Sequence, residues 1–95
     1  MTENTERIIK ALLAVPKGEV ASYGEIAKRA GVPNGARQVV RVLHSMTLKF
    51  NLPWYRIIRS DGFIALQGEG KNEQIELLRS EGVNVSDDGK VEIGK

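Results

Sequence analysis

Apolar residues in the first half of the chain recur at intervals of three and four, as along one face of an amphipathic helix. This pattern predicts a helix from about residue 4 to the region of Pro16, a short helix after Ser22, and a third over Ala36–Met46. Ser22 and Glu25 have the spacing of a capping box, whose hydroxyl and carboxylate accept hydrogen bonds from free amides. Two helices joined by a turn at residues 31–33 are typical of a helix-turn-helix.

Further along, the pattern changes to short apolar runs of the β type. Residues 56–59 and 63–66 form two such runs, and Ser60–Gly62 between them is a turn in which glycine can adopt a positive φ. The sequence therefore predicts a β-hairpin. Because it follows a helix-turn-helix, this hairpin would be the wing of a winged-helix domain.

The last third of the chain has a weaker pattern. Glu73–Ser80 is expected to form one more helix, and the glycine-rich residues 68–71 before it are expected to form a flexible loop. Residues 83–85 and 91–93 can pair as a small terminal hairpin. We therefore expect residues 1–95 to form a single α+β domain of the winged-helix type.

Composition excludes several kinds of site. The chain contains no cysteine, which excludes disulfides, thiolate metal ligands and a thiol nucleophile. A single histidine, His44, excludes a metal centre built from several histidines. No apolar run is long enough to span a bilayer and no charged-then-apolar leader opens the sequence, so we expect a cytoplasmic protein with no membrane partner.

The charges are distributed unevenly along the chain. Residues 1–59 hold ten Lys and Arg against four Asp and Glu, a net charge of +6, whereas residues 60–95 hold four against eight, a net charge of −4. A basic half of this kind indicates a surface that faces a polyanion. Arg37 and Arg41 are one helical turn apart, so they can straddle a nucleic-acid backbone or groove. The same spacing also suits a solvated helix face with local ion pairs.

Other candidate residues carry little information when each is taken alone. Tyr23, beside the helix cap, and Trp54, before the hairpin, are as compatible with core packing as with a binding site. Nothing in the spacing around His44 suggests a Ser-His-acid triad, and only scattered acids such as Glu25 and Asp61 stay open for a hydrolase. The residues by themselves favour a binding module over an enzyme.

Three segments are specific in combination: residues 18–27 (GEVASYGEIA), 35–40 (GARQVV) and 53–58 (PWYRII). Together they resemble the DNA-binding domain of O6-alkylguanine-DNA alkyltransferases. They resemble more closely the alkyltransferase-like proteins, which keep that domain but replace the alkyl-accepting cysteine, usually by Trp. The resemblance runs from about residue 5 to Gly82 and leaves the tail, residues 83–95, outside it.

The alkyltransferase active-site motif is Pro-Cys-His-Arg, and this chain has Pro53-Trp54-Tyr55-Arg56 in its place. An indole has no thiolate with which to attack an alkyl carbon. A tyrosine, with an ordinary pKa of about 10, is a poor substitute for the histidine that helps to deprotonate the thiol. Glu81, which matches the acid behind that histidine, then has nothing to orient. The resemblance therefore implies a protein that is not an enzyme and uses neither a metal nor a cofactor.

The recognition residues of the family are retained. In the family, the residue that matches Arg37 enters the minor groove and fills the gap left by a flipped nucleotide, and the residue that matches Tyr23 helps to rotate the base out. The small residues Gly35 and Ala36 permit close approach to the groove, and Trp54 would provide an aromatic wall for the extruded base. The predicted DNA-binding residues are Tyr23, Gly35, Ala36, Arg37, Gln38, Arg41 and Ser60. The predicted lesion pocket consists of Tyr23, Pro53, Trp54, Ile64, Ala65, Leu66 and Gln67.

Two features depart from the family pattern. The family has an Asn-Pro segment upstream of the active-site motif, whose Asn makes a structural hinge. Residues 44–47 replace it here, which leaves the local geometry open. Some alkyltransferase-like proteins also have a basic residue near position 67 that can face the bound base, and this chain has the neutral Gln67.

We therefore expect a monomer that recognises O6-alkylguanine in duplex DNA by minor-groove binding and nucleotide flipping. The resemblance implies that the complex flags damage for nucleotide excision repair and blocks a true alkyltransferase, in the cytoplasm or, in a bacterium, on the nucleoid. Three alternatives stay open: a winged-helix transcriptional regulator that reads undamaged DNA, a glycosylase-like hydrolase, and a protein–protein adaptor.

Overall fold

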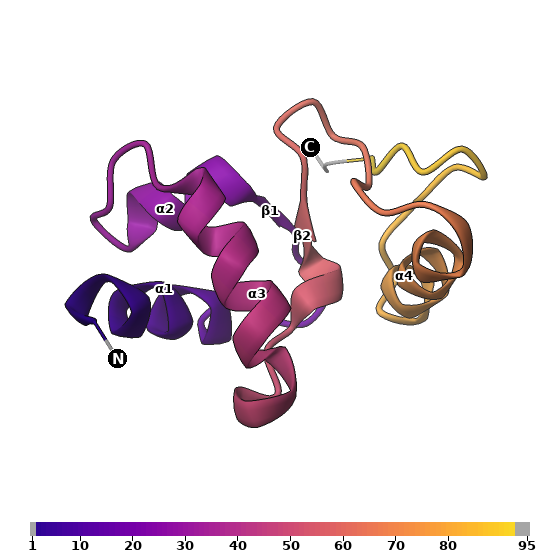
Figure 1. Ribbon diagram of the computed structural model, residues 1–95. Coiled ribbons are helices and arrows are strands. Elements are labelled where there is room, and N and C mark those ends of the chain that lie inside the picture. Colours follow the sequence, from indigo (N-terminus) through magenta and orange to yellow (C-terminus); the bar gives the residue numbers. More distant parts are fainter. Residues whose placement is uncertain (1, 93–95) are drawn as a thin grey trace.

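The fold consists of helices on both sides of a very short parallel sheet (Figure 1). The computed structural model describes residues 2–92 of the protein. Its elements in chain order are α1 (Glu3–Leu13), β1 (Ala21–Ser22), α2 (Tyr23–Arg29), α3 (Ala36–Phe50), the 3-10 helix η1 (Trp54–Arg56), β2 (Ile57–Ile58) and α4 (Gly68–Ser80). This arrangement confirms the α+β class.

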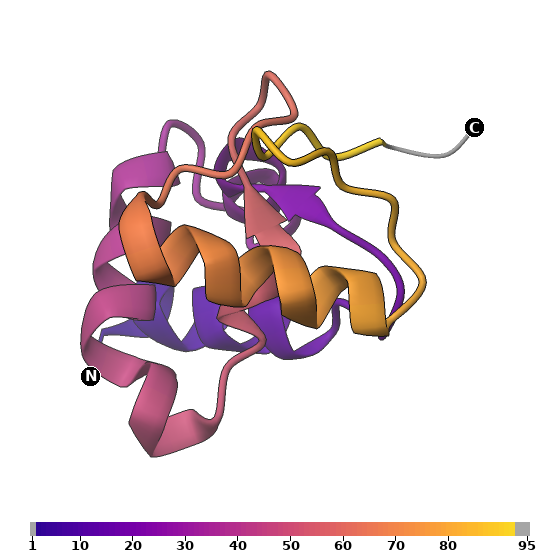
Figure 2. The same cartoon turned by 90° about the vertical axis from the view of Figure 1, so that its right-hand side faces the viewer.

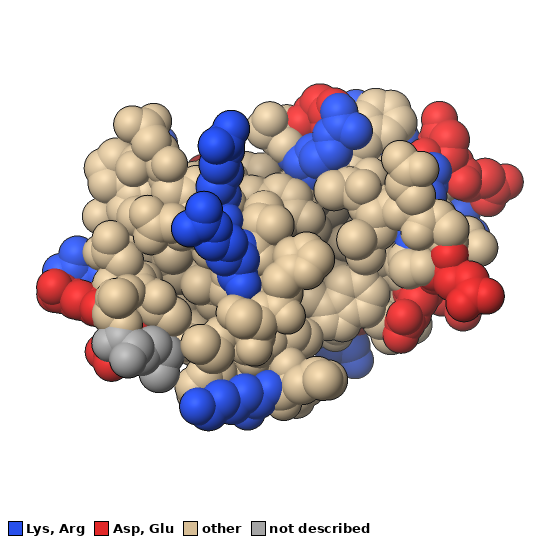
Figure 3. Space-filling view, in the orientation of Figure 1, with Lys and Arg blue, Asp and Glu red and all other residues tan. Residues whose placement is uncertain are grey.

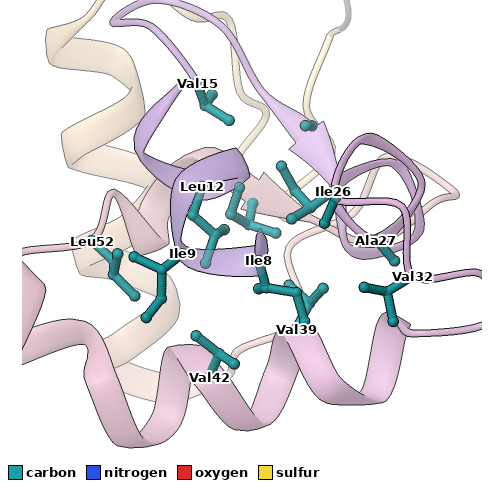
Figure 4. Close-up of a cluster of buried hydrophobic side chains, with 13 residues drawn as sticks. Ile8, Ile9, Leu12, Val15, Ile26, Ala27, Val32, Val39, Val42 and Leu52 are labelled. Atoms are coloured by element: carbon teal, nitrogen blue, oxygen red, sulfur yellow. The ribbon is translucent and has the colours of Figure 1, made fainter. Parts of the chain in front are cut away.

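Helices α2 and α3, which were predicted to form a helix-turn-helix, lie in the first half of the chain and pack with α1 around a hydrophobic core (Figure 4). Ile8 and Leu12 of α1, Ile26 of α2 and Val39 of α3 are fully buried there. The Ser22 hydroxyl caps α2 by accepting from the Glu25 amide at 3.0 Å. The Glu25 carboxylate does not reach back to the cap but accepts from Arg29, so only half of the predicted capping box forms.

Helix α3 is longer than predicted. It continues beyond Met46 to Phe50 and ends where Asn51 adopts a left-handed conformation with φ 53°. The hydroxyls of Ser45 and Thr47 donate to backbone carbonyls one turn earlier, so these polar residues stay inside the helix. Residues 44–47, where the family hinge is replaced, are therefore continuous helix.

The predicted wing hairpin is wrong in its pairing. β2 pairs with β1 in parallel, with Ala21 opposite Ile57 and Ser22 opposite Ile58. After the turn at residues 60–62, Phe63 forms an isolated bridge with Lys90 of the tail instead of extending a ladder with β2. The burial of β2 explains the difference, because Ile57 packs in the first core and Ile58 in a second core on the opposite side.

Helix α4 and the tail enclose the second core (Figure 2). The helix begins at Gly68, so the prediction of a flexible loop over residues 68–71 is wrong. It packs Ile75 and Leu78 on Ile58 and on three valines of the tail, Val83, Val85 and Val91. Val85 and Val91 form the bridge of the predicted terminal hairpin, whose last residue, Ile93, lies outside the described residues.

In the described part of the chain, no helix combines the length and the apolar character needed to cross a membrane.

Candidate base-binding pocket and nucleic-acid interface

A cavity of about 310 Å³ opens between α3, η1 and α4. Three of its lining residues, Tyr23, Trp54 and Leu66, belong to the predicted lesion pocket. The other lining residues are Val40, Leu43, His44, Thr47 and Gln74. The cavity is therefore mainly apolar, with a few polar groups on its walls, as expected for a site that holds a small organic group.

The two aromatic walls are placed by the ends of helices. Tyr23 is the first residue of α2, directly after the Ser22 cap, and its partial burial raises the pKa of its phenol. Trp54 is the first residue of η1, which forms because the Pro53 carbonyl accepts from the Arg56 amide at 3.0 Å. The Trp54 ring meets the Tyr55 ring edge-on, with centroids 5.8 Å apart and planes at 84°. This contact orients the indole at the cavity.

Four residues predicted for the pocket are not among those that line it. Pro53 is buried, and Ile64 is directed into the second core. Ala65 is exposed, and Gln67 occupies the exposed cap position before α4. Gln67 therefore does not face the cavity in this structure.

Sequence reasoning missed five of the lining residues, but they carry a signal. Val40, Leu43, His44 and Thr47 follow the spacing of one helical face, which α3 turns toward the cavity. Gln74 is a polar residue within the buried stripe of α4, where a charged or polar side chain is unusual. Only Thr47 lies beyond the predicted helices, so the other four residues could have been found from the sequence pattern.

The outer face of α3 carries the predicted DNA-binding side chains. Arg37, Gln38 and Arg41 are exposed, and neither arginine forms a salt bridge within residues 2–92. Figure 3 shows Lys and Arg standing over α3, whereas Asp and Glu gather beside α4 and the tail. The uneven charge along the sequence thus becomes an uneven charge in space.

The small residues before Arg37 have an internal role. Gly35 is buried, and a Cβ at this position would lie 2.6 Å from Val32 Cγ1 and 2.7 Å from the Val32 carbonyl oxygen. The turn between α2 and α3 therefore requires glycine here, whatever approaches from outside. Ala36 is half-buried at the start of α3.

The turn that follows β2 presents Ser60 to solvent. Arg59 and Asp61 on either side form an exposed ion pair at 2.6 Å, and the Asp61 carboxylate also accepts from the Phe63 amide. The turn is thus held by its own side chains, with the Ser60 hydroxyl at its tip.

Glu81 is the centre of a polar junction, and the prediction that it has nothing to orient is wrong. Its carboxylate accepts from the Tyr55 hydroxyl at 2.7 Å and from Arg56 through Nε at 3.0 Å and Nη2 at 2.6 Å. It also accepts from the Gly18 amide at 3.0 Å, and Arg56 Nη1 donates to the Val15 carbonyl at 3.0 Å. We call Val15, Gly18, Tyr55, Arg56 and Glu81 the Glu81 junction.

The junction is shielded from solvent, and its hydrogen bonds shift the pKa values of Glu81 and Tyr55. The side chains of Arg56 and Glu81 are only 15% and 7% exposed. The hydrogen bonds from Arg56, followed by those from Tyr55 and Gly18, lower the pKa of Glu81 to about 2. The same carboxylate raises the pKa of Tyr55, so the phenol stays protonated and continues to donate. Arg56 is therefore part of the internal structure and does not belong to the exposed basic surface on α3 that was predicted to face DNA.

Among residues 2–92, no group of three or more His, Cys, Asp and Glu side chains is arranged to hold a metal ion.

Comparison with known proteins identifies the family. Residues 3–83 match the family described as 6-O-methylguanine DNA methyltransferase, DNA binding domain. A DNA base-flipping protein of Vibrio parahaemolyticus is 42% identical over 89 residues, which cover 94% of this chain and 89% of that protein. Alkyltransferase-like protein 1 of Schizosaccharomyces pombe is 34% identical over 87 residues, which cover 90% of this chain and 81% of that protein.

Solved structures agree with these matches. S. pombe Atl1 in complex with damaged DNA containing O6-carboxymethylguanine aligns with a TM-score of 0.78 at 31% identity, over 99% of this chain and 91% of that one. Mycobacterium tuberculosis OGT in complex with DNA aligns with a TM-score of 0.67 at 34% identity, over 85% of this chain and 50% of that one. By sequence and by fold, the chain belongs to the family of the 6-O-methylguanine DNA methyltransferase DNA-binding domain and resembles its alkyltransferase-like members.

Proposed function

We propose that this protein recognises O6-alkylguanine in duplex DNA by flipping the damaged nucleotide into the cavity between Tyr23 and Trp54, and that it leaves the lesion chemically unchanged. The observation that carries the proposal is the position of the cavity. Besides its aromatic walls, the cavity is lined by Val40 and His44 of α3, which are within one helical turn of Arg37 and Arg41. These two arginines have no ion-pair partner among the described residues.

Base flipping follows from these parts. Arg41 would neutralise backbone phosphate, and Arg37 would enter the minor groove and fill the space that the flipped nucleotide leaves. Flipping a nucleotide out of a normal base pair costs a few kcal/mol, and flipping it out of a damaged pair costs less. This difference lets the protein select lesions without recognising the base sequence around them. Stacking on Trp54 would then return about 1–3 kcal/mol.

The absence of chemistry follows from residue types. The chain has no cysteine, and the indole at position 54 cannot accept an alkyl group. The Tyr55 hydroxyl donates a hydrogen bond to Glu81, and its raised pKa keeps it protonated, so it is a weaker nucleophile at neutral pH than an ordinary tyrosine. A protein of this kind acts by holding the lesion.

A bound but unrepaired lesion is useful only if another protein acts on it. We propose that the complex flags the site for nucleotide excision repair and shields it from alkyltransferases. In this proposal the monomeric protein works in the cytoplasm, on the nucleoid if the cell is bacterial. The turn at residues 59–63 would take the place of a wing, with the Ser60 hydroxyl on a phosphate.

The intrinsic fluorescence of Trp54 tests the proposal directly, because it is the only tryptophan. Titration with matched duplexes containing guanine or O6-methylguanine should give lesion-dependent quenching and tighter binding to the lesion. Arg37→Ala should reduce that preference to near unity. Equal affinity for both duplexes would instead support a regulator of undamaged DNA, and release of base or loss of the alkyl group would support an enzyme.

A further inference from the structure

Gln74 is the one buried polar side chain among the described residues, with 2% of its surface exposed. It lies on α4 between the second core and the cavity, which it lines. A buried amide of this kind must have its hydrogen-bonding groups satisfied, because an unpaired buried donor or acceptor is costly.

The two ends of the amide are distinguished by their surroundings. One end lies 2.9 Å from the Tyr55 carbonyl oxygen and 3.2 Å from the Ile57 carbonyl oxygen. Carbonyl oxygens only accept, so this end must be the NH2 group, and its two N–H bonds are both used. The segment that carries Trp54 therefore fixes the orientation of the amide.

The other end, Oε1, is then fixed as well. No hydrogen bond within residues 2–92 uses it, yet no buried side-chain oxygen or nitrogen in that range is without a partner. Oε1 must therefore be slightly accessible and not fully buried. Gln74 lines the cavity, so the cavity is the space from which this oxygen can be reached. Because the NH2 group is bonded to the Tyr55 and Ile57 carbonyls, the oxygen is the polar end of the amide that is left for the cavity, where it can only accept a hydrogen bond.

Alkylation at O6 determines which donor a flipped guanine can offer. The alkyl group removes the hydrogen from N1, so the ring nitrogens are acceptors and the exocyclic 2-amino group is the remaining donor of the base. O4-alkylthymine has lost its N3 hydrogen in the same way and has no donor.

We propose that Gln74 Oε1 accepts a hydrogen bond from the 2-amino group of the extruded base, and thereby makes the pocket select guanine adducts over alkylated thymine. This inference rests on the proposed function and adds a specificity-determining residue to it. Thr47 is the natural comparison, because it also lines the cavity with a polar group but belongs to α3. The Thr47 hydroxyl donates to the Leu43 carbonyl and could accept a hydrogen bond from a ligand. Unlike Gln74, however, Thr47 is only half-buried, so water can also reach its oxygen.

The test is a cycle of two bases and two proteins. Wild type and Gln74→Met are titrated with duplexes that contain O6-methylguanine or O6-methylhypoxanthine, which lacks only the 2-amino group. Wild type should bind the hypoxanthine analogue about tenfold more weakly, as expected for one lost hydrogen bond, and Gln74→Met should show less than about a threefold difference. Wild type and Gln74→Met are titrated with the same two duplexes. Any effect of the missing 2-amino group on base pairing in the DNA is therefore the same for both proteins and cancels when their preferences are compared.

Three further measurements separate the possible failures. Thr47→Val should keep the full tenfold preference, which places the acceptor on α4 and not on α3. Placing each base opposite an abasic site removes pairing altogether, so wild type alone reports on the 2-amino group even if Gln74→Met does not fold. O4-methylthymine in the same context should bind as weakly as the hypoxanthine analogue.

Equal binding of both purines by wild type would overturn the inference and leave the proposed function intact. If folded Gln74→Met kept the preference for O6-methylguanine over O6-methylhypoxanthine, the inference would also be overturned, because another group would then bind the 2-amino group. If wild type does not prefer O6-methylguanine to guanine, the proposed function itself fails.

Discussion

Arg41 and Arg56 belong to α3 and η1, two elements that both contribute residues to the cavity wall, but their surroundings differ completely. Arg41 is exposed and has no salt-bridge partner in the described part of the chain. Arg56 is 15% exposed, forms two hydrogen bonds with Glu81 and a third with the Val15 carbonyl. The same residue type is therefore available for a polyanion in one region and part of the internal structure in the other.

The difference separates a binding surface from the support that positions it. Within residues 2–92, Arg37 and Arg41 on the face of α3 form no ion pair, which leaves them available to contact phosphate. The Glu81 junction joins the end of α1, η1 and the end of α4, and so holds the segment that begins with Trp54. An exposed recognition face beside a rigid pocket wall suits a protein that must extrude a base and hold it.

The largest expected effect is the loss of the junction. Glu81→Ala leaves the buried Arg56 guanidinium without its partner and should lower the free energy of unfolding by about 3 kcal/mol. Glu25→Ala, which removes a half-exposed ion pair with Arg29, should cost less than about 1 kcal/mol. Urea unfolding of both variants measures the difference. Similar losses would mean that the junction does not support the fold as described.

The pH dependence of stability sharpens the same point. The pKa of Glu81 is about 2 in the folded protein and 4.5 without these partners, so its stabilisation is complete above about pH 4.5 and is lost as the pH falls toward 2. The stability advantage of wild type over Glu81→Gln should shrink by about 2–3 kcal/mol between pH 7 and pH 2. Urea unfolding of both proteins across this range tests the prediction, and a constant advantage would contradict it.

On the pocket side, Trp54→Ala should weaken binding to O6-methylguanine DNA by about 2 kcal/mol, or roughly thirtyfold, because the extruded base loses its stacking partner. Binding to the undamaged duplex should change less than about threefold. Fluorescence anisotropy of labelled duplexes measures both. Leu48→Ala is the control, since Leu48 is 99% exposed near the end of α3 and does not line the cavity. An equal loss on both duplexes would remove Trp54 from lesion recognition.

On the α3 side, Arg41→Gln should act on every duplex alike. We expect about a fivefold loss of affinity at low salt, with the slope of log affinity against log salt reduced by about 1. Arg7→Gln is the matched control, because Arg7 lies on α1 and is paired with Glu3 at 2.8 Å. A loss confined to damaged DNA would assign Arg41 to the lesion and not to the backbone.

Much of the molecule could be predicted because its signals are local. Helical spacing predicted α1, α2 and the start of α3, and the Ser22 cap formed where the sequence placed it. The prediction of lesion recognition came from the family resemblance of residues 18–27, 35–40 and 53–58, and the missing cysteine, with Trp54 in its place, added the absence of alkyl transfer. The extension of α3 to Phe50 was missed because periodicity does not show where a polar helix end stops, and here Asn51 ends it.

The remaining features depend on residues that are far apart in the chain. The parallel pairing of β1 with β2, the bond between Gly18 and Glu81 across 63 positions, and the bond between Gln74 and Ile57 across 17 positions have no signature in local pattern. By itself, the sequence determined which chemical groups the protein has and which helices it forms, because both depend on residue types and near neighbours. Only the tertiary structure decided which of those groups are paired inside and which stay free for DNA, because pairing depends on which distant segments the two cores bring together.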